Sequence, residues 1–302
     1  MQANLRMIAL GLLAVTLAGC ESTRWNWFKP NNDVAGKGAG SQSTAGLVTY
    51  LNDNARRIKS IRVDDMSIDA TMGNQTIGLR GRIYAEGPRN FRMKVVSPFG
   101  KDEVDIGSNR DEFWFWAAKN PEPYQYYCSY DDLNQGRVKG MPIPIQPDWV
   151  MEAMGLGPYV AEKYTLEPGD NQTIRLVEKT RSPQGQPVRK VIVMNRREVK
   201  APTPQVTAFL LIDEATGKEI CSAHITATAV DRTTGAILPY KMELRMPAQK
   251  MRMALKLDGA AVNTNIAATA FVRQPIDGVE PFNLATGRPE PRGVLPVQGF
   301  QK

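Results

Sequence analysis

The feature that most constrains this fold is an alternation of apolar and polar side chains at a period of two. It recurs between Arg62 and Val272, most clearly at 79–85, 91–95, 104–106, 242–246 and 251–257. Strands with this period have one apolar face and one wet face, as in an antiparallel sheet that covers a core. Turn residues rich in Gly, Pro and Asn separate the segments. We therefore expect about eleven or twelve antiparallel strands.

Two stretches depart from this period and predict helices. Apolar residues recur at spacings of three and four over 46–60, after a candidate capping residue, Ser43 or Thr44. A second, shorter helix is expected over 148–155, where Asp148 can cap it after prolines that forbid a central strand. A long sheet with one apolar face must curl or be covered, and these two helices are the candidates to cover it.

The first twenty residues resemble a bacterial lipoprotein signal. Arg6 precedes an apolar run over 7–18, which is shorter than the about 20 residues that span a bilayer. The run ends at Leu17-Ala18-Gly19-Cys20, where small residues precede a cysteine that can take a diacylglyceryl group. An ordinary signal peptide with a chance cysteine is the alternative. We predict a signal peptide over 1–19, lipidation at Cys20 and a palmitate-type anchor.

Lipidation would also define the compartment. More than one acyl chain at the N-terminus gives stable anchoring, so we expect a membrane-tethered protein at the periplasmic face of the cell envelope. The net charge of +7 then indicates an anionic membrane surface or solubility rather than nucleic acid. Glu21 follows the cysteine in place of Asp, which favours the outer over the inner membrane by the best-known sorting rule.

Composition divides the remaining chain into three parts. Residues 20–45 contain the lipidated cysteine and a linker rich in Gly, Asn and Ser, which we expect to be flexible. Residues 46–272 form the single β-rich domain. Residues 273–302 form a Pro- and Gly-rich tail that we expect to be extended or disordered. The aromatic residues at 25, 27 and 28 either rest at the membrane interface or pack on the domain.

Two sets of strand residues have a functional and a structural interpretation. Trp114 and Trp116 lie on the strand face that should be exposed to water. Either a helix covers them or they form a binding surface, and a strand buried between the sheet and a helix is the favoured interpretation. Methionines on the apolar phase either line a cavity for acyl chains or fill the core, and pattern alone favours core filling. These methionines are Met93, Met242, Met246, Met251 and Met253.

Basic residues dominate the wet phase of several strands. If these strands are neighbours, their side chains make a positive outer face suited to an anionic leaflet. An ordinary solvated sheet surface is the favoured alternative. The residues concerned are Arg80, Arg82, Arg92, Lys94, Lys241, Arg245, Arg252 and Lys256.

The sequence offers little for catalysis. Cys128 and Cys221 remain after lipidation, and the sequence leaves open whether they bond. The single histidine, His224, lies in a strand-like segment and is expected to be structural. Acidic pairs such as Asp64-Asp65 show no raised-pKa acid beside an ionised base, and no phosphate loop or nucleophile elbow occurs. We expect no enzyme activity, no cofactor and no metal site.

Several stretches together resemble a known family. They are 81–84 (GRIY), 91–100 (FRMKVVSPFG), 105–116 (DIGSNRDEFWFW) and 231–241 (DRTTGAILPYK). With the lipobox, the linker, the amphipathic helix and the strand meander, they resemble the outer-membrane lipoprotein carrier and receptor fold of LolA and LolB. The resemblance covers about 46–272.

The resemblance implies a mainly β (α+β) fold, in which a long antiparallel meander curls into an unclosed β-barrel with two helices as a lid. It implies an anchored protein that binds acyl chains or lipoproteins in an apolar cavity and aids lipoprotein localisation to the outer membrane. A periplasmic carrier protein is then among its expected partners. For the receptor's protruding apolar loop, 141–145 is a candidate by composition.

The expected cavity lining combines apolar strand residues from both halves of the domain. It consists of Phe91, Met93, Val95, Phe113, Phe115, Met242, Leu244, Met251 and Met253. The alternative is a structural or assembly lipoprotein of the envelope on the same fold, with a packed core and a protein partner.

Overall fold

The structure, a computed structural model, describes residues 43–290 except 123, 139, 142–145, 171 and 183. The predicted signal peptide, Cys20 and nearly all of the predicted linker lie outside these residues. The described chain is mainly β, with three α-helices and sixteen strands in one sheet. The helices are α1 (Thr44–Ala55), α2 (Tyr130–Asn134) and α3 (Pro147–Ala153).

The strands before α3 form a continuous antiparallel meander. They are β1 (Ser60–Met72), β2 (Gln75–Glu86), β3 (Asn90–Val96), β4 (Asp102–Ser108), β5 (Glu112–Ala117) and β6 (Tyr124–Ser129). The strands after α3 form a second meander up to β13, followed by three short strands. They are β7 (Tyr164–Pro168), β8 (Thr173–Arg181), β9 (Pro187–Asn195), β10 (Val206–Asp213), β11 (Glu219–Val230), β12 (Ile237–Met246), β13 (Met251–Asp258), β14 (Ala261–Val262), β15 (Glu280–Asn283) and β16 (Arg288–Pro289).

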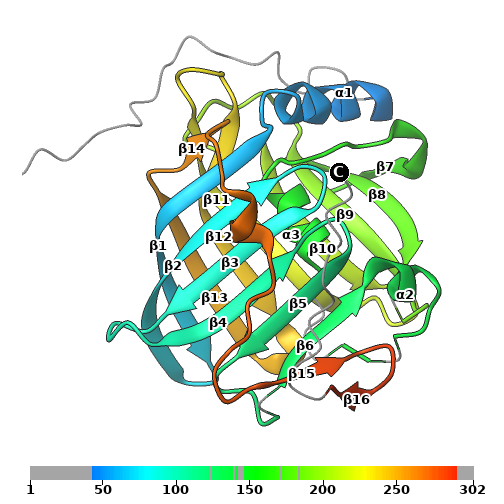
Figure 1. Cartoon of the computed structure of the whole chain (residues 1–302). Coiled ribbons are helices and arrows are strands. Elements are labelled where there is room, and N and C mark those ends of the chain that lie inside the picture. Colours follow the sequence, from blue (N-terminus) through cyan, green and yellow to red (C-terminus); the bar gives the residue numbers. More distant parts are fainter. Residues whose placement is uncertain are drawn as a thin grey trace, which may run out of the picture.

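Pairing of β1 with β13 joins the two meanders into one sheet that curls but does not close. The strand order is β16-β15-β6-β5-β4-β3-β2-β1-β13-β12-β11-β10-β9-β8-β7, and β14 pairs with β1. The two end strands, β7 and β16, are not paired with each other. Figure 1 shows α3 within the curl and α1 across its upper end. The predicted unclosed β-barrel with helices is therefore confirmed.

The two expected helices form, with shifted ends. Ser43 caps α1 by accepting a hydrogen bond from the backbone N–H of Gly46 at 3.1 Å, as the sequence predicts. The helix ends at Ala55 because the chain then turns into β1. Asp148, however, does not cap α3. Pro147 occupies the first turn, where its missing N–H costs nothing, and this starts the helix one residue earlier.

The C-terminal segment extends the sheet, which differs from the expected extended or disordered tail. After an extended stretch that contains a 3₁₀ turn (Ala268–Phe271), the four residues of β15 pair in parallel with β6. The two residues of β16 then pair with β15. Strands of two to four residues are too short to show an alternation, so the sequence gives no signal for them.

Candidate functional site

The inner face of the curl holds a large apolar cluster, here called the interior cluster. It is built from the inward residues of β1–β3 and β8–β13, and α1 and α3 pack against it. Of the nine residues expected to line a cavity, five are buried in this cluster, and Met251 and Met253 pack at its margin. The buried five are Phe91, Met93, Val95, Met242 and Leu244.

Phe113 and Phe115 belong to a second group, here called the aromatic cluster. It lies beneath β5, β6 and β15, and also contains Tyr126, Cys128, Tyr130, Val138 and Leu284. The rings of Phe115 and Tyr126 are stacked with their centroids 4.9 Å apart. The structure therefore splits the predicted lining into seven residues and two. Ile106 of β4 packs against both clusters.

Helix α1 is the roof of the interior cluster. Its side chains Leu47, Val48 and Leu51 are buried, with at most 5% exposed. They occupy one face because residues three and four apart align along a helix. The predicted period of 46–60 therefore identifies the covering face of this helix correctly, although the residues after Ala55 are not helical.

Two asparagines tie α1 to the rest of the molecule. Asn52 donates through Nδ2 to the carbonyl of Tyr159 at 2.8 Å and accepts from the N–H of Tyr159 at 3.0 Å. Asn54 makes the same pair of bonds with Ile237, at 2.9 and 2.7 Å. Residues two apart lie on opposite sides of a helix, so the two amides hold α1 on both flanks. Each amide thus binds both the backbone N–H and the carbonyl of a single residue.

The end of α1 is tied in the same manner. Arg57 donates through Nη1 to the carbonyl of Gly235 at 2.8 Å, and the side chain of Asn263 accepts from the N–H of Lys59 at 2.7 Å. The amide Nδ2 of Asn263 also donates to the carbonyl of Arg57 at 2.9 Å. All of these bonds join a side chain to backbone, and none is a strand pair.

Helix α3 fills the curl from within. Pro147, Trp149, Met151 and Ala153 are buried. Glu152 forms an ion pair with Lys190 of β9 at 3.0 Å, and burial raises the pKa of the Glu152 carboxyl despite the opposing effect of Lys190. The helix ends at Ala153, and Gly155 follows the capping residue Met154 with a φ of +92°, which suits a residue without a Cβ.

The closed roof leaves little free volume. A pocket of about 50 Å³ lies between α1, the end of α3 and the strands β10–β12. Tyr50, Met154 and Phe209 are among the residues that line it. A second pocket of about 240 Å³ lies beside Trp149 and the β8–β9 hairpin. Pockets for small ligands usually measure about 300–1,000 Å³. None of the nine predicted lining residues borders either pocket, so the described conformation is packed.

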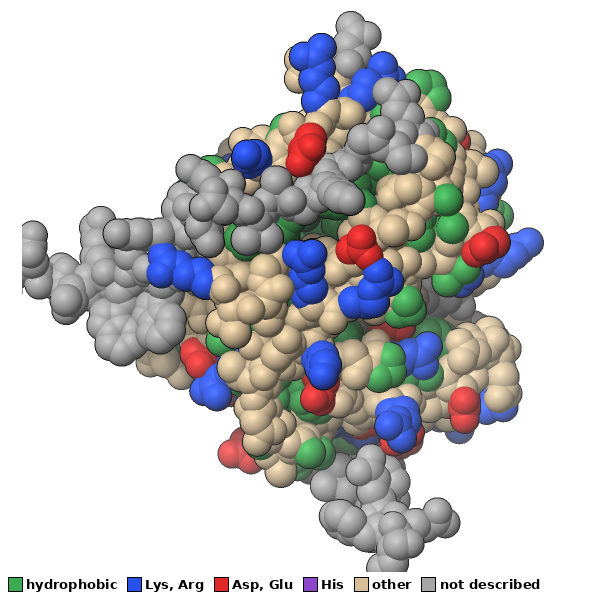
Figure 2. Space-filling view, turned by 90° about the horizontal axis from the view of Figure 1, so that it is seen from above, with side chains coloured by type: hydrophobic (Ala, Val, Ile, Leu, Met, Phe, Trp, Pro, Cys, Tyr) green, Lys and Arg blue, Asp and Glu red, His purple; other side chains and the backbone are tan. Residues whose placement is uncertain are grey.

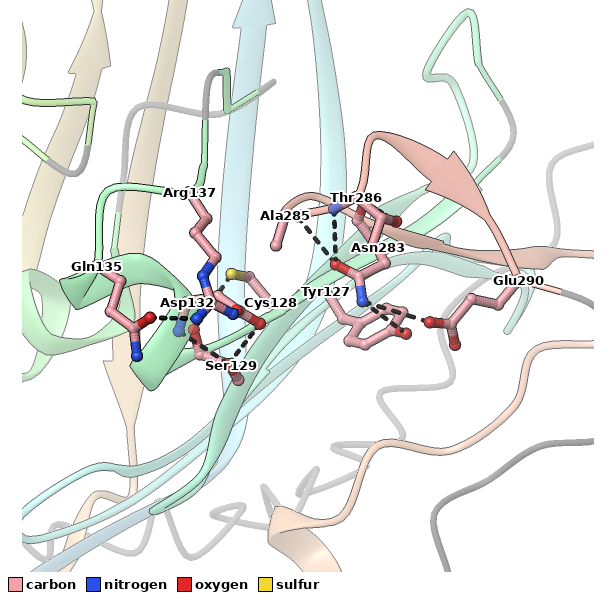
Figure 3. Close-up of polar contacts among 10 residues, drawn as sticks. All are labelled: Tyr127, Cys128, Ser129, Asp132, Gln135, Arg137, Asn283, Ala285, Thr286 and Glu290. Atoms are coloured by element: carbon pink, nitrogen blue, oxygen red, sulfur yellow. Dashed lines mark hydrogen bonds and ion pairs between the residues drawn. The ribbon is translucent and has the colours of Figure 1, made fainter.

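Polar contacts close the aromatic cluster at the end of β6 (Figure 3). Ser129 caps α2: it accepts from the N–H of Asp132 at 3.0 Å, and Arg137 binds the Asp132 carboxylate at 2.5 Å. On the other side, Asn283 of β15 donates to the hydroxyl of Tyr127 at 3.3 Å and accepts from the N–H of Ala285 at 2.9 Å. This cluster is thus closed by strand pairing and local turns.

The outer face of β5 is covered, but not by a helix. The segment 263–274, here called the strap, runs across the outside of β3–β5, in orange in Figure 1. Arg92 donates to the carbonyl of Val272 at 2.7 Å, and Asn109 donates to that of Phe271 at 3.2 Å. Trp114 is fully buried beneath this cover and Trp116 is 8% exposed. The strand is buried, as the favoured expectation requires, but the expected covering helix is wrong: the cover is the strap, which is extended apart from the 3₁₀ turn Ala268–Phe271.

Gly107 is required by this arrangement. A Cβ at this position would lie 2.3 Å from a ring atom of Trp114, far inside van der Waals contact. The directly opposite strand residue is Trp114 itself, so the indole lies flat over the glycine.

The eight basic residues lie on neighbouring strands, as one expectation requires, but they do not form one uniform positive face. Strands β12, β13, β1, β2 and β3 are adjacent, and β1 places acidic residues between the two basic groups. Glu243 pairs with Arg245 and Arg252, and Asp258 pairs with Lys256. Arg92 is buried. At the α1 end of the molecule, Figure 2 likewise shows basic and acidic side chains intermixed.

One apolar side chain projects far into solvent. Phe99, in the turn between β3 and β4, is 97% exposed. Figure 1 shows that this turn extends beyond the edge of the sheet. The candidate apolar loop 141–145 falls almost wholly outside the described residues, with only Met141 inside them. The sequence signal for Phe99 was present in the turn Pro98-Phe99-Gly100, where an aromatic residue is unusual.

The remaining reactive residues are separate from one another. Cys128 and Cys221 are both buried and free, one in the aromatic cluster and one in the interior cluster. Burial raises the pKa of Cys128 to about 11 and that of Cys221 to about 12. Among the described residues no group of three or more His, Cys, Asp and Glu side chains is arranged to hold a metal ion. No described helix has the length and apolar character needed to cross a bilayer.

No protein family and no curated protein matches the sequence of this chain. Solved structures show a distant likeness. A DUF1329 family protein from Desulfovibrio piger has 10% identity and a TM-score of 0.48, covering 76% of this chain and 95% of that chain.

Two further structures belong to the class that the sequence resembles. An outer membrane lipoprotein-sorting protein domain from Vibrio parahaemolyticus has 10% identity and a TM-score of 0.47, covering 74% of this chain and 95% of that chain. A LolA superfamily protein from Nitrosomonas europaea has 11% identity and a TM-score of 0.44, covering 75% and 97%. These likenesses concern overall architecture, and we base the proposals below on the residues of this chain.

Proposed function

We propose that this chain is a lipid-anchored, non-enzymatic protein of the cell envelope that binds acyl chains or acylated proteins within the curl of its sheet. It would thereby aid lipoprotein localisation to the outer membrane. The observation that carries the proposal is the construction of the roof. Helix α1 covers an apolar cluster and is tied by side-chain amides to backbone groups. It can therefore lift without the loss of any strand pair.

The chemistry of the interior cluster suits an acyl chain. Burial of apolar surface contributes about 25 cal/mol per Å², and an acyl chain can replace the contacts that Leu47, Val48 and Leu51 make in the closed form. Methionine side chains adapt to varied apolar shapes. Met66, Met154, Met242 and Met246 lie in this cluster, all at most 3% exposed.

Phe99 supports a position at a membrane. A fully exposed aromatic ring on a projecting turn favours the interface between lipid and water, where aromatic side chains concentrate. Lys101, two residues further on, can contact anionic headgroups. With the predicted anchor at Cys20, this turn would give the domain a second membrane contact, on the periplasmic face.

A second candidate is a structural or assembly lipoprotein that binds a protein partner. The packed interior favours it, because the pocket beneath α1 measures only about 50 Å³. The two candidates differ in one physical property. The carrier must open at α1, whereas the assembly protein keeps the roof closed.

A thiol beneath α1 provides the test, with Cys128 of the aromatic cluster as the internal reference. Ile225 lines the pocket under α1, so Ile225→Cys is added to full-length Cys20→Ala protein, a fluorescent fatty acyl probe is titrated, and alkylation at position 225 and at Cys128 is followed by mass spectrometry. We expect saturable probe binding, which slows alkylation at position 225 and leaves Cys128 unaffected. Absence of probe binding in both this protein and its Asn52→Ala variant would rule out the carrier and leave the assembly protein.

The anchor is tested separately in cells. Wild-type protein is expected in the membrane fraction. A variant in which a cleavable secretory signal without a lipobox replaces residues 1–20 is expected in the soluble periplasmic fraction with an unchanged circular dichroism spectrum. Retention of this folded, cleaved variant at the membrane would refute lipidation as the anchor. A Phe99→Ser variant of the soluble form is expected to lose residual binding to vesicles.

A further inference from the structure

A groove of about 230 Å³ lies on the outer face of the sheet, on the opposite side from the interior cluster. Arg82 and Tyr84 of β2 and Arg92 and Lys94 of β3 form its floor. Thr269 and Gln274 of the strap form its other wall. By the liquid volume of water, about 30 Å³ per molecule, the groove holds a small polar group several times that size.

The floor of the groove places like charges together. Arg82 lies directly opposite Lys94 in the antiparallel register of β2 and β3. Like charges in this position destabilise a sheet. Arg82 forms no ion pair with any described residue, and Lys94 lies opposite Asp105, which already binds Arg92. Within β2–β4 these three cations face one carboxylate, and on its other side Arg82 lies opposite the β1 bulge that contains Asp64 and Asp65.

Arg92 adds a rigid, buried cation. Its side chain is 4% exposed; Nη2 lies 2.5 Å from Asp105, and Nη1 donates to the carbonyl of Val272 at 2.7 Å. Its third donor, Nε, is buried without a hydrogen-bond partner in the described structure. Asp105 Oδ1 and the indole Nε1 of Trp114, which adjoin Arg92, are also buried without a hydrogen-bond partner among the described residues. Buried polar atoms are almost always partnered, so this cluster behind the groove has unused hydrogen-bonding capacity of both kinds.

Neither aspartate of the β1 bulge lines the groove or forms an ion pair with Arg82 among the described residues. Tyr84 donates its hydroxyl to Asp64 at 3.1 Å, and Asp64 forms an ion pair with Arg62 at 2.8 Å. The groove therefore offers cationic donors from the strands, the hydroxyl of Thr269, and the one N–H of the Gln274 amide that does not donate to the carbonyl of Val272.

We propose that this groove binds a phosphate-type oxyanion, with Arg82 and Lys94 as its principal ligands. Guanidinium and ammonium groups form charge-assisted hydrogen bonds with phosphate oxygens, and the positions of both strand residues are fixed by the sheet. The same chemistry is presented by a soluble phosphate ester and by a phospholipid headgroup. The proposal does not rest on acyl binding, because it concerns the other face of the sheet.

The test compares two double variants with the same loss of charge. Full-length Cys20→Ala protein is titrated calorimetrically at low ionic strength with inorganic phosphate and with glycerol 3-phosphate. Arg82→Gln with Lys94→Gln is expected to weaken binding at least about tenfold. The matched control, Arg175→Gln with Lys241→Gln, removes two exposed cations of the distant strands β8 and β12 that form no described ion pair, and is expected to change binding less than about twofold. Arg92 is left intact because its ion pair is buried.

A vesicle arm separates the two sources of the oxyanion. Co-sedimentation with phosphatidylglycerol vesicles is compared with phosphatidylcholine vesicles for the same proteins. If the Arg82→Gln, Lys94→Gln variant alone loses binding to phosphatidylglycerol vesicles, the groove is a headgroup site. If this variant loses phosphate binding in calorimetry but keeps vesicle binding, the ligand is a soluble ester. Both results support the groove. Equal losses in both double variants, or no phosphate binding by any protein, would overturn it. Unchanged thermal unfolding confirms that the variants are folded.

Discussion

The interior cluster and the aromatic cluster lie on the same face of one sheet, yet they are covered in different ways. The interior cluster is covered by helices, and α1 is held by the amides of Asn52 and Asn54. The aromatic cluster is covered by β15, which is paired through backbone to β6, and by the capped α2 turn. Lifting α1 breaks side-chain hydrogen bonds and apolar contacts but no strand pair. Removing the cover of the aromatic cluster breaks the sheet.

This difference predicts that the interior cluster opens more readily than the aromatic cluster. Local opening needs only the free energy of the contacts that are lost, so it follows units of structure rather than the whole fold. The interior cluster has such a unit in α1. In the aromatic cluster, stacked rings such as Phe115 and Tyr126 are fixed to paired strands.

The largest effect should come from the aromatic cluster. Phe113→Ala removes a ring that is 2% exposed, and the paired strands cannot collapse into the space. We expect the free energy of unfolding to fall by about 3–5 kcal/mol in urea titrations. Phe99→Ala is the control, because that ring is 97% exposed, and it should change stability by less than about 0.5 kcal/mol. Similar losses in both variants would contradict the assignment of the cluster.

Asn52→Ala should loosen α1 specifically. It leaves the backbone N–H and carbonyl of Tyr159 unpaired, at a cost of about 1–3 kcal/mol. Hydrogen–deuterium exchange should accelerate in α1 and remain unchanged in β5 and β6. Asp53→Ala, an exposed neighbour on the same helix, serves as the control. Equal acceleration in α1 and β5 would show that the two regions open together.

Thiol alkylation can compare opening at α1 with opening at the aromatic cluster in a single reaction. In the Cys20→Ala background Cys128 and Cys221 should both be alkylated slowly, because both are buried and their pKa values are raised to about 11 and about 12. With Ile225→Cys placing a thiol in the pocket under α1, adding Asn52→Ala and Asn54→Ala should accelerate alkylation at position 225 about tenfold for each 1.4 kcal/mol of lost stability, with Cys128 unchanged. If Cys128 reacts faster instead, the roof of the aromatic cluster is the weaker one.

The smallest effect concerns the pH dependence of stability and the single histidine of the chain. His224 lies on the outer face of β11, where burial, together with Arg245, lowers the pKa of its imidazole; Glu219 and Glu243 act in the opposite direction. The unfolded chain therefore takes up a proton first as pH falls through about 6.5, and stability decreases. We expect a loss under about 1 kcal/mol between pH 7.5 and 5.5. His224→Gln should remove it in urea titrations at the two pH values.

The sequence predicts those parts of the fold that repeat locally. Alternation identified the strands and the inward side of Phe91, Met93 and Met242, and the period near 3.6 identified the covering face of α1. Phe113 and Phe115 have the same phase as the predicted lining. They lie in another cluster because residues 130–141 and 282–284, distant in sequence, close that part of the curl.

Other features depend on contacts that no local pattern reveals. Asn52 and Asn54 look like the wet side of a helix, and only the positions of Tyr159 and Ile237 make them ties. Trp114 and Trp116 indicate that something covers β5, but the covering residues near Val272 have no periodicity of their own. The groove beside Arg82 arises because two strands and the strap meet there.

The short strands at the two ends of the sheet affect how the protein aggregates at high local concentration. An unclosed sheet presents rows of free N–H and carbonyl groups that can template strand addition by other molecules. Here β16 is two residues long and ends in Pro289, and β7 is five residues long and ends in Pro168. Proline has no N–H to donate and interrupts such rows. The protein can therefore keep its curl open at one side without acting as a seed for intermolecular β-sheet polymers.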